Sequence, residues 1–233
     1  MPRTKGTSSK RTAARRTPRT EPEEEKAVGG WRRRALDRSL VDAKVRALNK
    51  GEGFIQSASK LLNKTGALDF TVQDVVDNSD LSLRSFYQTF ASKEDLLIAM
   101  FEEYVESAAE WQREQMEEHD DPIEQIRVFL ESLWVGKLSP EVTRSLALYS
   151  LNLSATAPAE LAEALAPQLE VLHAAVERGV RTGQVRDDIS SRRIAEILLH
   201  TGIAAVHNTI LRTGTVPLEI LERQIDAYIQ RAN

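Results

Sequence analysis

Cysteine is absent from this chain of 233 residues. Its absence excludes a disulfide scaffold, a zinc ribbon, a thiol nucleophile and a thiol redox switch, because each of these needs cysteine sulfur. With 41% hydrophobic and 28% charged residues, the chain has the balance of a globular protein that is long enough to bury a core without disulfides or metals. A reducing, cytoplasmic setting fits this composition.

Long apolar runs and catalytic motifs are absent as well. The longest apolar stretches without charge, 145–159 and 197–211, have 15 residues each, fewer than the roughly 20 that a membrane-spanning helix needs. The basic N-terminus has no apolar segment behind it, so no secretory signal is expected. The chain has no HExxH, GxSxG or phosphate-loop motif, and we therefore expect neither an enzyme nor a cofactor.

Charge is distributed unevenly along the chain. Residues 1–50 contain 15 Lys and Arg against 6 Asp and Glu, whereas the remainder contains 16 against 29. A basic front end on an acidic body can present one face to a polyanion. Residues 1–30 have too few apolar side chains to fold by burial, which predicts a disordered basic tail. A plain solvated tail or an over-extended start site explains the same composition equally well.

The rest of the chain has the spacing of amphipathic helices, and no stretch alternates with period two for long enough to form a strand. Capping residues and prolines mark helix starts, and glycines mark helix ends. The fold class that we predict is all-α. We expect helices over 31–48, from Phe54 to Gly66, over 72–76, from Ser82, from Ser92 through Trp111, from Pro122, from Pro140, from Pro158 to Gly183 with a kink at Pro167, over 194–211 and over 218–228.

The most informative segment is residues 71–94, TVQDVVDNSDLSLRSFYQTFASKE. Thr71 and Asp74 form a capping box before a first short helix, and Ser82 opens a second one after the turn at 78–80. Two short helices joined in this way form a helix-turn-helix, in which the second helix enters the DNA major groove.

The second of these helices has an apolar side and a polar side. We expect the apolar side to pack inward, and it consists of Leu81, Phe86 and Phe90. Arg pairs with guanine and Gln with adenine, so the outward side can read bases; it consists of Leu83, Arg84, Ser85 and Gln88. Donors suited to phosphate lie at the rim, and these are Thr71, Tyr87 and Lys93. With the helix cap Ser82, and with Arg32, Arg33 and Arg34 as an N-terminal arm, these residues make up the DNA-binding set that we expect.

This segment resembles the TetR family of bacterial transcriptional regulators. The residues that carry the resemblance are Leu81-Ser82, Ser85-Phe86-Tyr87, Phe90 and Ser92-Lys93-Glu94, preceded by Ala58, Leu61, Gly66 and Thr71. The resemblance covers about residues 50–101, and the GQVRDD stretch at 183–188 is similar to the family's late inter-helical turn. The chain departs from the family pattern at Ser79 and Asp80, where Ala and Gly are common, at Thr89, where His is usual, and in its basic extension of about 50 residues.

The resemblance implies a homodimer with an N-terminal three-helix DNA-binding unit. It further implies a larger helical domain that binds a small molecule, usually with weakened operator binding, and no enzymatic activity. We therefore predict four parts of the chain: a tail at 1–30, a possible extra helix at 31–48, the DNA-binding unit at 49–98 and a ligand-binding and dimerisation domain at 99–233. Small residues at 194–211, with the last helix, favour a four-helix bundle between two copies; closure of the monomer core is the alternative.

The ligand pocket is expected among apolar and aromatic residues of the middle helices. These candidates are Met100, Tyr104, Phe129, Leu133, Trp134, Tyr149 and His173. Their lack of charge favours a hydrophobic ligand such as a fatty acyl, lipid or aromatic compound. Glu196, His200 and His207 share a helix face, but a spacing of seven residues is about 10 Å, too far for one ion. We therefore expect no metal, and His200 and His207 as packing residues or as part of a polar pocket wall.

The function that we predict is that of a cytoplasmic, nucleoid-associated DNA-binding transcriptional regulator of bacteria. It binds a two-fold symmetric operator on double-stranded DNA as a homodimer, and it is a repressor released by a small hydrophobic effector. Three alternatives stay open: an activator, a ligand-independent DNA-binding protein, and a helical scaffold whose basic tail binds an acidic partner. Binding of DNA without release by any metabolite would indicate the first two.

Overall fold

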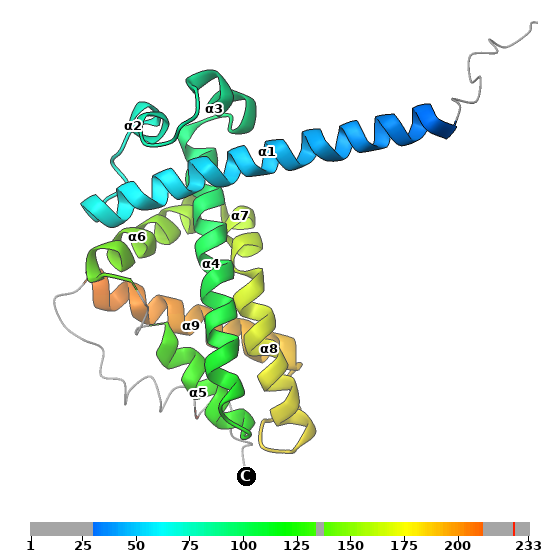
Figure 1. Cartoon of the computed structure of the whole chain (residues 1–233). Helices are drawn as coiled ribbons and strands as arrows, with labels where there is room; N and C mark the ends of the chain where they lie inside the picture. The colour runs from blue at the N-terminus through cyan, green and yellow to red at the C-terminus, as the bar shows by residue number, and fades with distance from the viewer. Residues whose placement is uncertain (1–29, 134–137, 212–225, 227–233) are drawn as a thin grey trace, which may run out of the picture. The chain divides into compact units, whose positions relative to one another are not determined.

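The computed structural model describes the backbone of residues 30–133, 138–211 and 226, and the side chains of these except residues 32, 33, 36 and 211. Every regular element in these ranges is an α-helix, which confirms the all-α prediction. The helices are α1 (Gly30–Thr65), α2 (Val72–Asp77), α3 (Leu83–Thr89), α4 (Lys93–Glu117), α5 (Pro122–Ser132), α6 (Pro140–Thr156), α7 (Pro158–Ala164), α8 (Ala166–Arg181) and α9 (Ser191–Leu211) (Figure 1). The chain divides into two compact units, Met1–Val45 and Arg46–Asn233. No described helix is long and apolar enough to cross a membrane.

Side-chain caps explain where the helices begin. Thr71 accepts from the N–H of Asp74 and Asp74 accepts from the N–H of Thr71, so the predicted capping box opens α2. Ser82 and Ser92 cap α3 and α4 through the amides three residues on. Proline occupies the first turn of α5, α6 and α7, where its missing N–H leaves no hydrogen bond unmade. These starts were expected from the residue types alone.

Two of the predicted helix boundaries are wrong. The helices expected at 31–48 and from Phe54 are one continuous helix, α1, with Gly51 and Gly53 inside it. A Cβ on Gly53 would come within 3.2 Å of the Leu81 side chain, so this glycine lets α1 pass close to the turn before α3. The helix expected from Pro158 to Gly183 is broken rather than kinked, because α7 ends at Ala164 and Pro167 lies in the first turn of α8. The helix expected at 218–228 and the tail at 1–29 lie outside the described residues.

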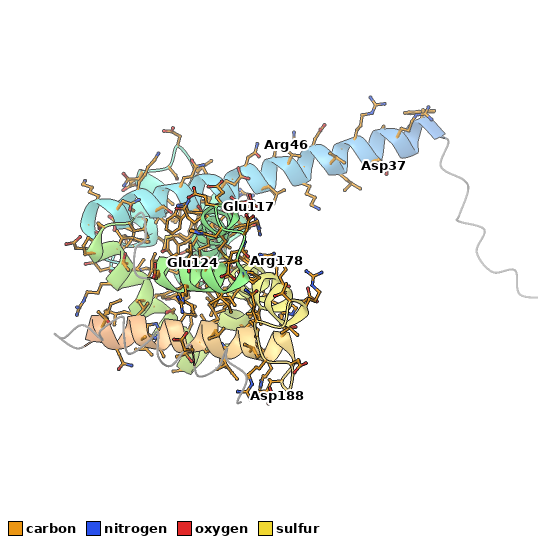
Figure 2. All side chains as sticks on the ribbon, turned by 90° about the horizontal axis from the view of Figure 1, so that it is seen from below. Asp37, Arg46, Glu117, Glu124, Arg178 and Asp188 are labelled. Carbon is orange, nitrogen blue, oxygen red and sulfur yellow. The ribbon has the colours of Figure 1, made fainter. Side chains whose placement is uncertain are left out.

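The core of the second unit lies where α4 meets the helices around it. α4 packs against α5, α7 and α8, and α8 packs against α5 and α9. The buried side chains include Phe86 from the short helices, Leu96 and Val105 from α4, and Phe129 and Leu172 further along the chain. Figure 2 shows side chains filling the interior between these helices. The predicted domain boundary at 98/99 lies within α4 and stays a prediction.

Two glycines end helices in the left-handed conformation, as their position predicted. Gly66 has φ 69° and Gly183 has φ 75°. Alanine at either position suffers the left-handed penalty, about 1–2 kcal/mol. The surroundings differ, because a Cβ on Gly66 would lie 2.6 Å from the Cβ of Glu141 whereas nothing lies within 4 Å of Gly183.

We expect Gly66→Ala to destabilise the protein by about 1–3 kcal/mol more than Gly183→Ala, because the first substitution also forces α6 away from the end of α1. Urea unfolding followed by circular dichroism measures both changes. Equal losses in the two variants would show that the nearby Glu141 side chain adds nothing to the cost of the Gly66→Ala substitution.

Candidate nucleic-acid interface and ligand cavity

The helix-turn-helix is held in place from α1. The Ser57 hydroxyl on α1 donates to the carbonyl of Val75 on α2 at 2.7 Å. The ring of Phe54 on α1 lies edge-on to Phe86 on α3, with centroids 5.3 Å apart, and 6.3 Å from the ring of Phe90. All three rings are buried, so the inward packing of Phe86 and Phe90 is as predicted, and Leu81 is partly buried against them.

The side of α3 opposite these rings is exposed. Leu83 is 42% exposed and Tyr87 is 59% exposed, and Arg84 and Gln88 are exposed beside them. Leu83 and Tyr87 are among the few large apolar side chains that the described part of the chain leaves in solvent. A short helix therefore presents one apolar, one cationic, one phenolic and one amide side chain on a single face.

Ser85 does not belong to this face, and the prediction that it points outward is wrong. It is 7% exposed and lies on the inner side of α3, next to the fully buried Phe86. Its N–H donates to the cap Ser82 at 3.2 Å. Its buried hydroxyl has no hydrogen-bond partner among the described residues.

Two of the predicted phosphate-binding residues already have partners within the protein. The hydroxyl and the N–H of Thr71 both donate to Oδ2 of Asp74 at 2.7 Å, and these hydrogen bonds lower the pKa of that carboxyl. Nζ of Lys93 donates to the carbonyl of Leu68 at 2.8 Å and lies 5.0 Å from the ring centre of Phe70. An ammonium has three donors, so a phosphate contact by Lys93 stays a prediction. Arg34 is exposed, whereas the side chains of Arg32 and Arg33 lie outside the described part.

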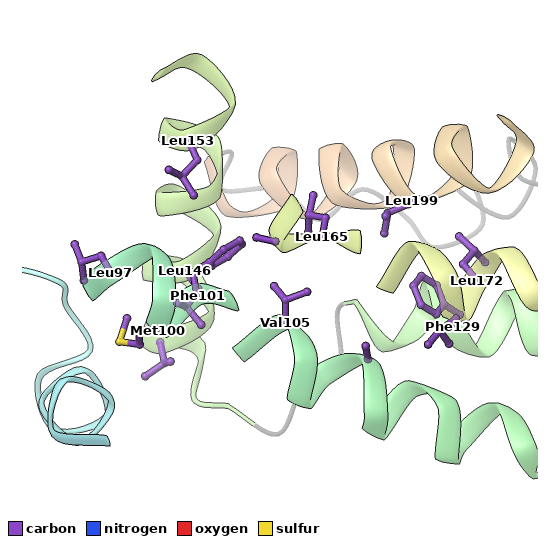
Figure 3. Close-up of a cluster of buried hydrophobic side chains, with 14 of the residues drawn as sticks. Leu97, Met100, Phe101, Val105, Phe129, Leu146, Leu153, Leu165, Leu172 and Leu199 are labelled. Carbon is purple, nitrogen blue, oxygen red and sulfur yellow. The ribbon is translucent and has the colours of Figure 1, made fainter. Parts of the chain in front are cut away.

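A cavity of about 240 Å³ is lined by residues from each of the helices α4 to α9. Figure 3 shows Phe101, Val105, Leu146 and Leu165, four of its apolar lining residues, in the buried cluster. The wall also includes polar side chains, namely Tyr104, Ser107, Gln112, Ser132, Thr143, Ser150, Gln168 and His207. None of the described lining residues is Asp, Glu, Lys or Arg.

The predicted pocket residues agree with this cavity only in part. Tyr104 and Leu133 line it, and Trp134 lies outside the described residues. The other four do not line it. Met100 and Phe129 are buried in the core, Tyr149 packs edge-on against Phe101 at 5.8 Å, and His173 lies 3.1 Å from the hydroxyl of Ser191. The spacing of apolar residues cannot distinguish core residues from cavity-lining residues, because both kinds lie on buried sides of their helices.

The polar residues of the cavity form two groups. In the first, Nε2 of Gln112 donates to the Ser132 hydroxyl at 2.8 Å, and Nε2 of Gln168 donates to Oε1 of Gln112 at 3.1 Å. In the second, the Ser150 hydroxyl lies 2.8 Å from Nε2 of His207. Sequence reasoning missed the glutamines, although a glutamine on the apolar side of a helix is a usable signal. His207 lies in a polar pocket wall, one of the two roles expected for it, whereas His200 is exposed.

Burial lowers the pKa of His207 below its ordinary value of 6.5, although a backbone hydrogen bond with Ala147 acts in the opposite direction. The unfolded chain therefore binds a proton more readily than the folded one, and stability falls as the pH drops below about 6.5. We expect the unfolding free energy of His207→Gln to decrease less with falling pH than that of the unsubstituted protein. The variant His200→Gln, at an exposed position, is expected to show the full decrease. Unfolding free energies measured between pH 7.5 and 5 test this. Superimposable profiles of His207→Gln and the unsubstituted protein would contradict it.

Comparison with known proteins finds a family likeness in the DNA-binding segment. Residues 54–100, which comprise the end of α1, the helix-turn-helix and the start of α4, match the family model described as bacterial regulatory proteins, tetR family. Over these residues the chain is similar to the DNA-binding segment of that family. No curated protein matches it in sequence.

Several solved structures share the fold of this chain, one of them described as a TetR-family transcriptional repressor. A Thermus thermophilus FadR in complex with lauroyl-CoA is 18% identical, with a TM-score of 0.61 over 78% of this chain and 97% of that one. Reduced Escherichia coli NemR is 17% identical, with a TM-score of 0.58 over 78% and 97%. RolR in complex with resorcinol is 18% identical, with a TM-score of 0.57 over 82% of this chain and 100% of that one. The TetR fold therefore extends beyond the matched segment into the cavity-bearing helices.

Proposed function

We propose that this protein is a TetR-family regulator that binds a two-fold symmetric DNA site as a homodimer, with α3 in the major groove, and that it is a repressor released by a small molecule in the cavity. The observation that carries the proposal is the exposed face of α3, formed by Leu83, Arg84, Tyr87 and Gln88. Arg and Gln are bidentate readers of guanine and adenine in the major groove. Tyr87 and the more distant Lys93 supply phosphate contacts at its edge, whereas both donors of Thr71 are taken by Asp74.

A route from the cavity to the DNA-binding unit supports the release step. Thr143, Leu146 and Ser150 on α6 line the cavity. Ser145, on the same helix, donates its hydroxyl to the carbonyl of Gly66 at 2.5 Å, at the end of the helix that anchors α3. A ligand that moves α6 therefore acts directly on α1. The loss of operator affinity is limited to the ligand's preference between the two conformations.

The proposal is tested by selecting bound fragments from sheared genomic DNA with the full-length protein at near-physiological salt, where weak non-specific binding is suppressed. We expect recovery of one two-fold symmetric site. Unrelated fragments whose binding decreases smoothly with salt would contradict sequence-specific regulation and leave the basic N-terminal segment as the nucleic-acid-binding part.

The N-terminal arm is a separate part of the proposal. Between residues 51 and 100 the chain has four Lys or Arg against seven acids, so attraction to DNA must come largely from the basic segment before it. We expect deletion of residues 1–34 to weaken operator binding and to reduce the salt slope by about 0.9 for each phosphate that the arm neutralises. Replacement of Arg32, Arg33 and Arg34 by Gln keeps the chain length and removes three of these positive charges, so it separates loss of charge from loss of length. Unchanged affinity and slope after the deletion would refute the role of the arm.

A further inference from the structure

We propose that the cavity selects an uncharged, largely apolar molecule of one or two rings that carries a hydroxyl or carbonyl group. The proposal rests on the proposed function for its regulatory meaning, and it adds the chemical class of the effector. The arguments come from the charge, the hydrogen-bonding groups and the size of the cavity.

The charge argument comes from the lining. Burying an ionised group without a partner costs several kcal/mol or more, and no described lining residue offers a carboxylate, an ammonium or a guanidinium. His207 does not supply a positive charge near neutral pH, since burial lowers its pKa. Among the described residues of this wall, an anionic ligand and a cationic ligand would each find no countercharge.

The hydrogen-bonding argument comes from polar groups of the wall that make no hydrogen bond to another described residue. Gln168 uses one N–H on Gln112, and its carbonyl oxygen has no partner among the residues that the structure describes. The Tyr104 hydroxyl on the opposite helix has no described partner either, and burial raises its pKa, so it is a neutral donor. Neutral amide and phenol groups pair best with a hydroxyl or a carbonyl.

The size argument uses the volume of about 240 Å³. This is below the roughly 300–1,000 Å³ of pockets for drug-sized ligands. A one- or two-ring molecule fits this space better than a long acyl chain does.

Four probes that share one ring and differ in one group test the proposal. They are para-ethylphenol, ethylbenzene, para-ethylbenzoate and the protonated para-ethylbenzylamine, each titrated into the full-length protein by calorimetry at pH 7. We expect para-ethylphenol to bind about threefold to tenfold more tightly than ethylbenzene, the effect of one net hydrogen bond. We expect both charged probes to bind at least about a hundredfold more weakly than the phenol. Equal or tighter binding of either charged probe, or no binding of any probe, would overturn the proposal.

Two variants test whether Gln168 and Tyr104 cause the preference for para-ethylphenol over ethylbenzene. We expect Gln168→Leu and Tyr104→Phe to lower the affinity for para-ethylphenol toward that for ethylbenzene, and to leave ethylbenzene binding unchanged. Tyr104→Phe removes one oxygen and keeps the ring, so it tests the proposal even if Gln168→Leu does not fold. The exposed Gln56→Leu on α1 is the matched control, and we expect it to bind all four probes as the unsubstituted protein does. A preference for the phenol that survives both cavity variants would assign it to a different site.

This test separates the two proposals. If the protein selects a two-fold site on DNA but shows no preference for the phenol, the ligand class is wrong and the proposed function stands. If it prefers the phenol in the predicted way but selects no DNA site, the ligand class stands and the proposed function is wrong.

Discussion

Arg84→Ala is expected to weaken binding to the selected operator by about 2–6 kcal/mol, roughly 30-fold or more. Arg84 is exposed on the outer face of α3, and a bidentate arginine contact to guanine contributes about 1–3 kcal/mol of discrimination. A homodimer makes the contact twice, once in each half-site, so the loss doubles. Fluorescence anisotropy with a labelled operator measures it, and non-specific DNA is expected to show a much smaller change.

Arg113→Ala is the matched control for this prediction. Arg113 is an exposed arginine on α4, so its substitution removes the same charge away from α3. We expect its operator affinity to stay within a factor of about three of the unsubstituted protein. If Arg84→Ala and Arg113→Ala weakened binding equally, α3 would contribute charge rather than base recognition.

Phe86→Ala is expected to destabilise the protein by about 3–5 kcal/mol, the cost of emptying a buried aromatic site. Phe86 is fully buried between Phe54 and Phe90, with ring centroids 5.3 and 5.7 Å away. These three rings join α1 to α3, so their loss removes the support of the DNA-binding face as well. Urea unfolding measures the stability change.

Tyr87→Ala, at the position after Phe86, distinguishes a residue that contacts DNA from one that stabilises the fold. Tyr87 is an aromatic residue like Phe86 but is 59% exposed, so we expect a loss of at most about 1 kcal/mol in stability and a clear loss of DNA affinity. Similar stability losses in both variants would contradict the assignment of Phe86 to the core and Tyr87 to the surface.

The helices could be predicted where a local chemical signal marks them. The capping box of Thr71 and Asp74, the serine cap at Ser92 and the prolines after Asp121 and Ser139 act within a single turn, and the structure has each of them. The long helix α1 was missed because Gly51 and Gly53 lower helix propensity locally. Gly53 leaves room for the Leu81 side chain, which a Cβ at this position would approach to 3.2 Å; this contact is distant in sequence.

The two parts of the candidate site differ in how far the sequence predicts them. Three of the four residues expected on the outer face of α3 are exposed, because helical spacing from the buried Phe86 places their side chains on the opposite side. The prediction is wrong for Ser85, since a small polar side chain gives no sign that it lies on the inner side. The cavity depends on how α4, α6, α8 and α9 meet, and their contacts join residues as far apart as Ser150 and His207. The spacing of residues along one helix carries no information about how that helix packs against helices distant in sequence.

The most direct test of the account is hydroxyl-radical footprinting of the selected operator with the full-length protein. The account predicts two protected segments related by a two-fold axis and centred about one helical turn, or a multiple of it, apart. With Arg84→Ala at a concentration that restores occupancy, the same segments stay protected while discrimination against base changes in each half-site is lost. One continuous protected region without symmetry, or unchanged discrimination in the Arg84 variant, would contradict the claim that α3 reads the DNA sequence.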